Sequence, residues 1–370
     1  MSVIVASPAY PRPPLDGDKV RWSSLLPQLA KLEPLDGVFG FMPALGEIRD
    51  PTFDMAFASL AIVPTANYEV TARAGLLALR GQPSAFGRRA TPRWQRAVAA
   101  AATQHPQAPL LLLGTSGGFI PAGLRGTLLD LIDVRSRVRT TSADRLTSGR
   151  MLAAELALVE RHHIALACEA DRQWLVSHGA NAARIHLVPH GVGPQFFEGA
   201  PPADSRTIVF VGSLQYAPNR QAIDWFLKNC WPSLRNVDAT LRIVGYGAER
   251  IAAGSGIEVF ANVSDVGPHY RAAALTIAPL LEARGTQFKV LESMASGVPV
   301  VGTSPVAGGL FADHPALVAD DPRAFIAACM ALLDQPSTRL EIGRRGPEYI
   351  RRHHDWAASA AMLRELLLRL

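Results

Sequence analysis

Residues 284–301 read RGTQFKVLESMASGVPVV and carry the most informative pattern in the chain. Thr286 can cap a helix that begins directly after it, and Gly297 is placed to end that helix. A short apolar strand is predicted at 299–302. The amino end of the helix presents unpaired backbone N–H groups and a positive partial charge, so it suits a diphosphate.

The same helix offers two charged side chains of opposite sign. Lys289 and Glu292 are three residues apart and therefore share one helix face. A lysine suits phosphate oxygens, whereas a carboxylate one turn further on suits hydroxyl groups such as those of a ribose. Gly285 lets the backbone approach a ligand closely. The plain alternative is an amphipathic helix with an ordinary Lys–Glu pair, and the segment alone does not exclude it.

Outward from this segment, short apolar runs alternate with helical stretches in both directions. Strands are expected at 3–6, 109–113, 128–134, 164–167, 185–188, 207–211, 240–244, 257–260 and 275–278. Helices are expected at 19–32, 149–161, 171–178, 220–229, 321–333, 340–353 and 356–370. This alternation is typical of α/β folds with parallel sheets covered on both faces. A Pro/Gly/Ala-rich break at 191–205 predicts a linker between two such units.

Several stretches in order resemble one family. They are RIHLVPHGV (184–192), VFVGSLQYAPNRQAIDWF (209–226), LRIVGYG (241–247) and IEVFANVSDVGPHYRAAALTIAPL (257–280), followed by the segment at 284–301. Together they resemble the family 4 glycosyltransferases, whose donor helix follows a Gly-rich turn and reads KxLEAMAxGxPVV. The likeness extends over nearly the whole chain and is strongest to bacterial members of polysaccharide pathways.

The resemblance implies an α/β fold of the GT-B type, with two Rossmann-like doubly wound domains facing across a cleft. Residues 1–193 are expected to form the acceptor domain, with 354–370 packing back on it. Residues 194–353 are expected to form the donor domain. The implied reaction moves a sugar from a nucleotide-diphosphate sugar to a glycan, lipid-linked or small-molecule acceptor. It proceeds with retention and needs neither a metal nor another cofactor.

The resemblance also implies the site residues. The expected donor-binding residues are Gly212, Asn219, Asn262, Val263, Arg284, Gly285, Thr286, Lys289, Val290, Leu291 and Glu292. The loop expected on the acceptor side contains Gly17, Asp18 and Lys19. Asp133 is the expected catalytic residue, because it ends the strand at whose end the family often places a histidine. Asp130, three residues earlier, lies in the same strand, and a buried structural role is an open alternative for an aspartate there.

The chain departs from the family pattern at the diphosphate. The family's first carboxylate falls on Arg284, and the nearest acid, Glu282, is displaced by two residues. A common arginine and lysine of the second domain fall on Ser213 and Asn219. The diphosphate charge is therefore expected to meet Arg284, Lys289 and the helix amino end. These losses leave two alternatives to an active transferase, a weak or inactive binding subunit and a nucleotide-sugar epimerase of the same fold.

Composition narrows the class of protein. The 370 residues are 48% hydrophobic and 19% charged, which suits globular domains rather than disorder. Three scattered cysteines predict neither disulfides nor a zinc site. The amino-terminal segment lacks the features of a signal peptide, so a cytoplasmic location is expected.

Positive charge is concentrated in the first half, with 20 Lys+Arg against 15 Asp+Glu in residues 1–195 and 17 of each in 196–370. Much of the excess lies in arginine-rich stretches at 80–96 and 135–150. Either these arginines form a solvated surface, or they face an anionic acceptor or the inner face of an anionic membrane. Nucleic acid is not expected, because aromatic residues do not interleave with these stretches.

Two weaker motifs suggest other enzymes. Residues 114–118, GTSGG, match the G-x-S-x-G of a hydrolase, but Pro121 and Gly123 oppose the long helix that this motif needs. Gly245 and Gly247 form part of a dinucleotide fingerprint, yet Arg250 takes the place of its third glycine. Neither a hydrolase nor a dehydrogenase is expected.

Overall fold

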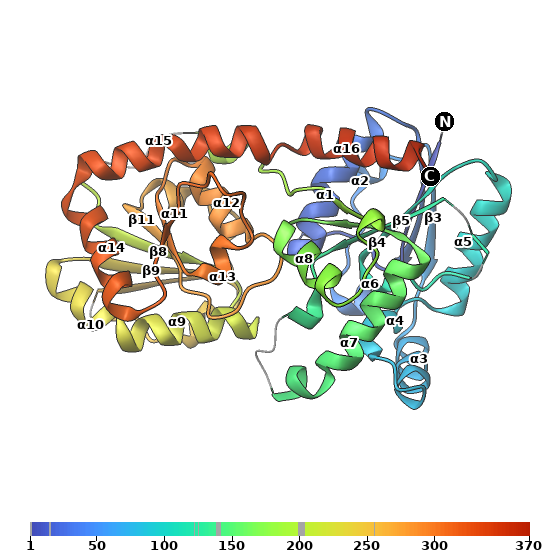
Figure 1. Cartoon of the computed structure of the whole chain (residues 1–370), viewed down its shortest axis with the longest axis horizontal. Helices are drawn as coiled ribbons and strands as arrows, with labels where there is room; N and C mark the ends of the chain where they lie inside the picture. Colours follow the sequence, from blue (N-terminus) through green and yellow to red (C-terminus); the bar gives the residue numbers. More distant parts are fainter. Residues whose placement is uncertain are drawn as a thin grey trace. The chain divides into compact units, whose positions relative to one another are not determined.

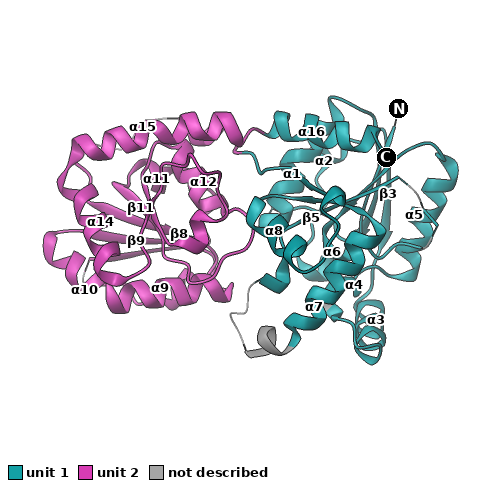
Figure 2. Cartoon of the chain, in the orientation of Figure 1, with its two compact units in different colours: residues 1–137, 142–191, 356–370 teal, residues 138–141, 192–355 magenta. Residues whose placement is uncertain are grey.

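The computed structural model describes residues 2–14, 16–121, 123–124, 126–137, 142–198, 204–254 and 256–370, without the side chains at 85 and 142–146. The chain forms two compact units (Figure 2). Unit 1 contains residues 1–137, 142–191 and 356–370, and unit 2 contains 138–141 and 192–355. The chain thus leaves unit 1 at residue 191 and returns to it for the last helix.

Unit 1, which contains both ends of the chain (Figure 1), is built on a seven-stranded parallel sheet in the order β3-β2-β1-β4-β5-β6-β7. Its strands are β1 (Val3–Ser7), β2 (Leu35–Phe41), β3 (Ser59–Pro64), β4 (Leu110–Leu113), β5 (Thr127–Ile132), β6 (His163–Leu166) and β7 (Ile185–Leu187). The strands β1, β4 and β5 are buried along their whole length, as expected for parallel strands covered on both faces.

Helices connect and cover these strands. They are α1 (Gly17–Ala30), α2 (Pro51–Asp54), α3 (Asn67–Leu79), α4 (Ser84–Gly87), α5 (Pro92–Gln104), α6 (Gly114–Gly117), α7 (Ser142–Arg161), α8 (Glu169–Ser177) and α16 (Trp356–Leu368), with 3-10 turns η1 (Pro43–Leu45), η2 (Arg135–Arg137) and η3 (Ala182–Arg184). The carboxy-terminal α16 packs on α1 of the same unit. Arg364 of α16 donates to the Glu33 carboxylate at 2.7 Å and fixes the end of α16 beside the end of α1.

Unit 2 is built on a six-stranded parallel sheet in the order β10-β9-β8-β11-β12-β13. Its strands are β8 (Thr207–Val211), β9 (Thr240–Gly245), β10 (Ile257–Ala261), β11 (Leu275–Ala278), β12 (Val300–Gly302) and β13 (Leu317–Val318). Its helices are α9 (Ala217–Asn229), α10 (Trp231–Leu234), α11 (Gly267–Arg271), α12 (Phe288–Ala295), α13 (Ser304–Ala307), α14 (Pro322–Asp334) and α15 (Pro336–His353), with turns η4 (Pro194–Phe197), η5 (Arg235–Val237) and η6 (Ala248–Arg250).

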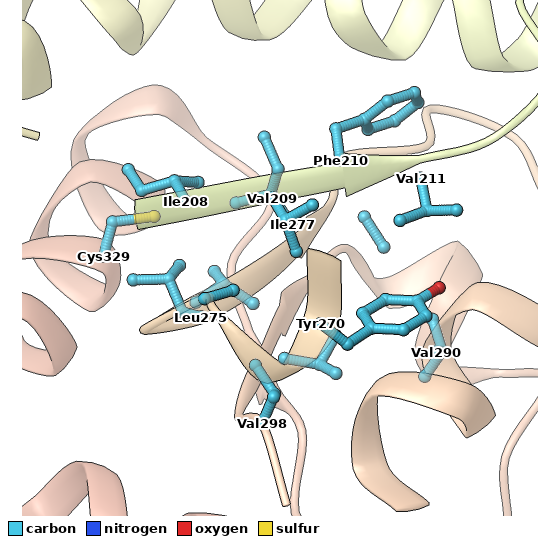
Figure 3. Close-up of a cluster of buried hydrophobic side chains, with 14 of the residues drawn as sticks. Ile208, Val209, Phe210, Val211, Tyr270, Leu275, Ile277, Val290, Val298 and Cys329 are labelled. Atoms are coloured by element: carbon cyan, nitrogen blue, oxygen red, sulfur yellow. The ribbon is translucent and has the colours of Figure 1, made fainter. Parts of the chain in front are cut away.

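The core of unit 2 surrounds β8 and β11. Figure 3 shows β8 with apolar side chains on both sides, and Tyr270 of α11 among them with its hydroxyl oxygen in red. Val290 of α12 lies in the same cluster and is fully buried. This burial holds α12 on the sheet, so that the position of its first turn is determined by the core.

The structure contains every strand that the alternation predicts, with ends that differ by at most two residues. Among the described residues, the strands β2, β3 and the two-residue β13 are not predicted, and neither are the four helices α2, α3, α4 and α5. The strand β3 alternates between exposed and half-buried residues and lies at the sheet edge, so its apolar signal is weak. The predicted linker at 191–205 contains the passage between the units, although residues 199–203 lie outside the described residues.

Candidate active site

The order of strands in unit 2 reverses between β8 and β11. From β8 the chain continues to β9 and β10 on one side, whereas β11, β12 and β13 lie on the other. The loops that follow β8 and β11 leave the same edge of the sheet in opposite directions. In open parallel sheets ligands bind at this switch point, outside the carboxyl ends of the strands. The predicted donor residues Gly212, Arg284 and Lys289 are all carried by these two loops and the helix α12.

The Lys289 side chain contacts residues of β8, of the loop after β8 and of α9. It is buried, and Nζ donates to Asn219 Oδ1 at 2.5 Å. Nζ also lies 4.8 Å from the centroid of the Phe210 ring, a cation–π contact. A Cβ atom on Gly212 would lie 2.8 Å from Asn219 Nδ2 and 3.0 Å from Lys289 Nζ, so a larger residue there would displace both side chains. Burial lowers the pKa of Lys289 to about 7.

Glu292 lies one turn further along α12 and is half-buried. Its Oε2 accepts a hydrogen bond of 3.1 Å from the buried Tyr270 hydroxyl. Burial raises the pKa of Glu292 to about 7, while the Tyr270 hydrogen bond and the Lys289 charge oppose the rise. The two groups of opposite sign therefore both titrate near neutral pH, which is a common property of functional sites.

The β11 loop adds a second cation beside the β8 loop. The Arg284 guanidinium lies 5.9 Å from the centroid of the Tyr216 ring, where Tyr216 precedes α9. Gly285 has a φ of 57°, in the left-handed region that favours glycine. The prediction that Thr286 caps α12 is wrong. The helix begins one residue later with Gln287 as its cap, and the Thr286 hydroxyl donates to the Gly309 carbonyl at 2.6 Å.

The remaining predicted donor residues differ in what they expose. Val290 and Leu291 are fully buried, and their N–H groups both donate to the Gln287 carbonyl, so neither offers a group to a ligand. Asn262 is exposed after β10 with a φ of 56°, and Val263 packs partly on the core. Both lie at the same edge of the sheet as the β8 loop, two strands away.

Unit 1 contains its own switch point, between β1 and β4. A pocket of about 300 Å³ lies there, lined by the loop after β1, the start of α1 and the turn after β4. The predicted acceptor residues Gly17, Asp18 and Lys19 form the first turn of α1, and Asp18 and Lys19 line the pocket. The Asp16 carboxylate caps this turn by accepting the Lys19 N–H at 2.9 Å.

The two aspartates at the end of β5 have different surroundings. Asp130 is fully buried and accepts from the Arg21 guanidinium at 2.8 Å and from Trp22 Nε1 at 3.0 Å. Asp130 therefore has a buried structural role. Asp133 is half-buried in a tight turn, where its N–H donates to the Leu131 carbonyl. Asp133 is not among the residues that line the pocket.

Sequence reasoning missed several members of both sites. Tyr270 contacts Glu292 and Phe210 contacts Lys289, and the resemblance to the family singles out neither Tyr270 nor Phe210. Arg88 and Arg135 line the pocket of unit 1 and come from the two arginine-rich stretches. A spacing rule does not find such residues, because their loops meet only when the sheet assembles.

The two weaker motifs do not form their sites. Only the four-residue α6 follows β4, and the Ser116 hydroxyl has no histidine partner among the described residues. Gly245 ends β9 and Gly247 follows it, but β9 is not at the switch point. The short turn η6 lies where a cofactor-binding helix is needed.

Comparison with known protein families gives a match within unit 2. Residues 205–335 match the family model Glycosyl transferases group 1. They form a group 1 glycosyltransferase domain. This glycosyltransferase domain contains the switch point and the Lys289–Glu292 pair.

Over a longer stretch, the chain is 24% identical across 268 residues to the D-inositol 3-phosphate glycosyltransferase of Kineococcus radiotolerans. The match covers 60% of this chain and 60% of the relative's length.

Solved structures extend the comparison to the whole fold. The sucrose-phosphate synthase of Thermosynechococcus elongatus superposes with a TM-score of 0.74 at 14% identity, over 100% of this chain and 98% of the other. HepE of Anabaena in complex with UDP-glucose superposes with a TM-score of 0.64 at 12% identity, over 100% of both chains. Around its glycosyltransferase domain, the chain therefore has the two-domain α/β fold of the GT-B type.

Proposed function

We propose that the chain transfers a sugar from a nucleoside diphosphate sugar to an acceptor, with the donor held by unit 2 and the acceptor by unit 1. The observation that carries this proposal is the buried Lys289 and, one helical turn further on, the half-buried Glu292, at the switch point of a group 1 glycosyltransferase domain. HepE binds UDP-glucose with the same fold, which supports a nucleotide-sugar donor for this chain.

In the proposed reaction the bond between the sugar C1 and the diphosphate breaks, and its electron pair stays on the diphosphate oxygen. The acceptor hydroxyl forms the new bond on the same face of the sugar and passes its proton to that oxygen. Lys289 and Arg284 neutralise the departing diphosphate, a role that a metal plays in other enzymes. Glu292 accepts hydrogen bonds from the ribose hydroxyls.

Asp133 is the proposed acceptor-side carboxylate. It follows Ile132, whose φ of 75° is an uncommon value for a β-branched residue. Strained backbone of this kind clusters at functional sites. The carboxylate is proposed to orient the acceptor hydroxyl while the diphosphate leaves.

The deciding experiment compares the fates of a labelled donor. A thermal-shift panel of UDP, GDP and ADP sugars first identifies the donor. The protein is then incubated with that donor, with and without phosphorylated and neutral sugar acceptors. A glycosylated product supports the proposal, whereas a free epimer identifies an epimerase. Binding without any turnover identifies the inactive binding subunit.

We also propose a peripheral contact with anionic membrane, made through α3. Tyr68, Leu76 and Leu79 lie along one side of this helix and are 73%, 45% and 87% exposed. Arg80 follows them, and the first half of the chain carries the whole positive excess. An exposed apolar stripe beside basic residues suits the interface of an anionic bilayer. No helix among the described residues is long and apolar enough to cross a membrane.

Sedimentation with anionic vesicles tests this contact. The Leu76→Gln, Leu79→Gln double variant should lose vesicle binding, and binding by the unaltered protein should fall with salt. Met362→Gln with Leu368→Gln is the matched control, because these residues of α16 are also exposed. Equal binding by all three proteins would exclude α3 as the contact.

A further inference from the structure

The pocket of unit 1 has a place in the fold that favours a ligand. It lies where the loops after β1 and β4 diverge, so it occupies the switch point of its own sheet. Gly114 begins the turn after β4 with a φ of 66°, and a Cβ atom there would lie 2.8 Å from the Trp22 ring. The glycine thus lets the turn pack on Trp22 at the base of the pocket.

Cations dominate the charged lining of this pocket. Lys19, Arg88, Arg89 and Arg135 face two acids, Asp16 and Asp18. Two of the cations have acidic partners. Arg89 pairs with the buried Glu47, and Arg135 lies 4.0 Å from Asp18.

The other two cations have no such partner. The Lys19 ammonium and the Arg88 guanidinium have no hydrogen-bond or ion-pair partner within the described ranges. A small pocket with two uncompensated cations attracts an anion.

Neutral donors complete the lining. Thr115 and Ser116 lie in the turn after β4, and their hydroxyls have no partner among the residues that the structure describes. A guanidinium, an ammonium and two hydroxyls offer hydrogen bonds from several directions. A tetrahedral phosphate has enough oxygens to accept them, whereas a carboxylate has only two.

We propose that this pocket binds a phosphate group, with Lys19 and Arg88 as its cationic contacts. Resting on the proposed function, the inference assigns a phosphorylated substrate to unit 1. A phosphate monoester on the acceptor and the diphosphate of the donor share this chemistry. UDP should compete with phosphate for the pocket only if the pocket binds the donor diphosphate.

The test is calorimetric titration of the full chain with inorganic phosphate at constant ionic strength. Arg88→Gln and Lys19→Gln should each weaken phosphate binding about tenfold or more, the scale of a lost charged hydrogen bond. Arg93→Gln is the matched control, because Arg93 is an exposed arginine of α5 outside the pocket. Equal phosphate affinity in all four proteins, or no saturable binding by the unaltered one, would overturn the inference.

Repeating the titration in saturating UDP separates the two sources. Phosphate binding that persists assigns the pocket to the acceptor, and binding that UDP abolishes assigns it to the donor diphosphate. The result is independent of the proposed function. A chain that fails to bind any nucleotide sugar still gives a decisive phosphate titration with the pocket variants.

Discussion

Replacing both charged groups of the proposed donor site, Lys289 and Glu292, should make unit 2 more stable and should weaken its binding of nucleotide. Burial raises the pKa of Glu292 to about 7, so its ionisation makes folding less favourable as the pH rises from about 4.5 to 7. Burial lowers the pKa of Lys289 to about 7, so its protonation makes folding less favourable as the pH falls from about 10.5 to 7. The pair therefore costs most stability near neutral pH.

The proposed perturbation is the double variant Lys289→Met, Glu292→Gln. Burial disfavours the charged form of both groups, so replacing them with uncharged groups of similar size should leave the protein equally stable or stabilise it, by about 1–4 kcal/mol on the scale known for buried ion pairs. For a unit of this size each kcal/mol raises the melting temperature by about 2–4 °C. Nucleoside diphosphate affinity should fall about 100-fold or more, because two charged hydrogen bonds of about 1.5–3 kcal/mol each are lost.

The assay combines thermal unfolding with calorimetric titration of UDP, GDP and ADP. Each single variant leaves one charged group buried without its partner, so it should be less stable than the double variant. Arg242→Met with Glu258→Gln is the control, because this pair lies at the surface of the same unit and its loss should change stability by less than about 1 kcal/mol. A double variant that binds nucleotide as tightly as the unaltered protein would refute the donor site.

Three further outcomes are expected. Nucleoside diphosphate affinity should be greatest near pH 7, because Lys289 loses its charge above that pH and Glu292 gains a proton below it; calorimetry from pH 5.5 to 8.5 in Glu292→Gln should show that only the acidic limb disappears. Asp130→Asn should lower the free energy of unfolding by about 3–5 kcal/mol in urea titrations, because the buried Arg21 loses its counter-charge, whereas Asp133→Asn should lower kcat and leave both stability and nucleotide affinity unchanged. Transfer should continue in EDTA, and a full loss that Mg²⁺ restores would contradict the metal-free reaction.

The arrangement of Lys289 and Glu292 at the proposed donor site could be predicted from sequence because the two residues lie close together in the chain. Lys289 and Glu292 share one short helix, so the helical repeat alone places them on one face. What lies opposite them could not be predicted in the same way. Asn219 meets Lys289 from 70 residues away, and Tyr270 meets Glu292 from a separate helix. The sequence showed that the family's lysine is replaced by Asn219, and the structure shows that this amide instead accepts from Lys289.

The pocket of unit 1, in contrast, could not be predicted from the sequence. Its cations come from α1, from the segment after α4 and from the turn after β5, which are brought together only by the order of strands in the sheet. In the sequence, nothing distinguishes Arg88, which lines the pocket, from Arg93, which belongs to the same arginine-rich stretch and lies outside it. The excess of positive charge can be predicted from the sequence. Which of its arginines line a pocket and which lie on the open surface depends on the fold.

Asp130 and Asp133 show why position in a strand is not enough to assign a role. Both belong to the same apolar run, and Asp133 is the closer of the two to the place where the family often carries a histidine. In a regular strand, residues three apart point to opposite faces, so at most one of them can face a given site. In the structure the Asp130 side chain is fully buried and accepts hydrogen bonds from Arg21 and Trp22. Ile132 has a φ of 75°, in the left-handed region, and the strand ends there. Asp133 therefore leaves the alternation of the strand and is half-buried. A carboxylate that is fully bonded inside the protein cannot also act on a hydroxyl of the acceptor, so any acceptor-side role at this strand end belongs to Asp133.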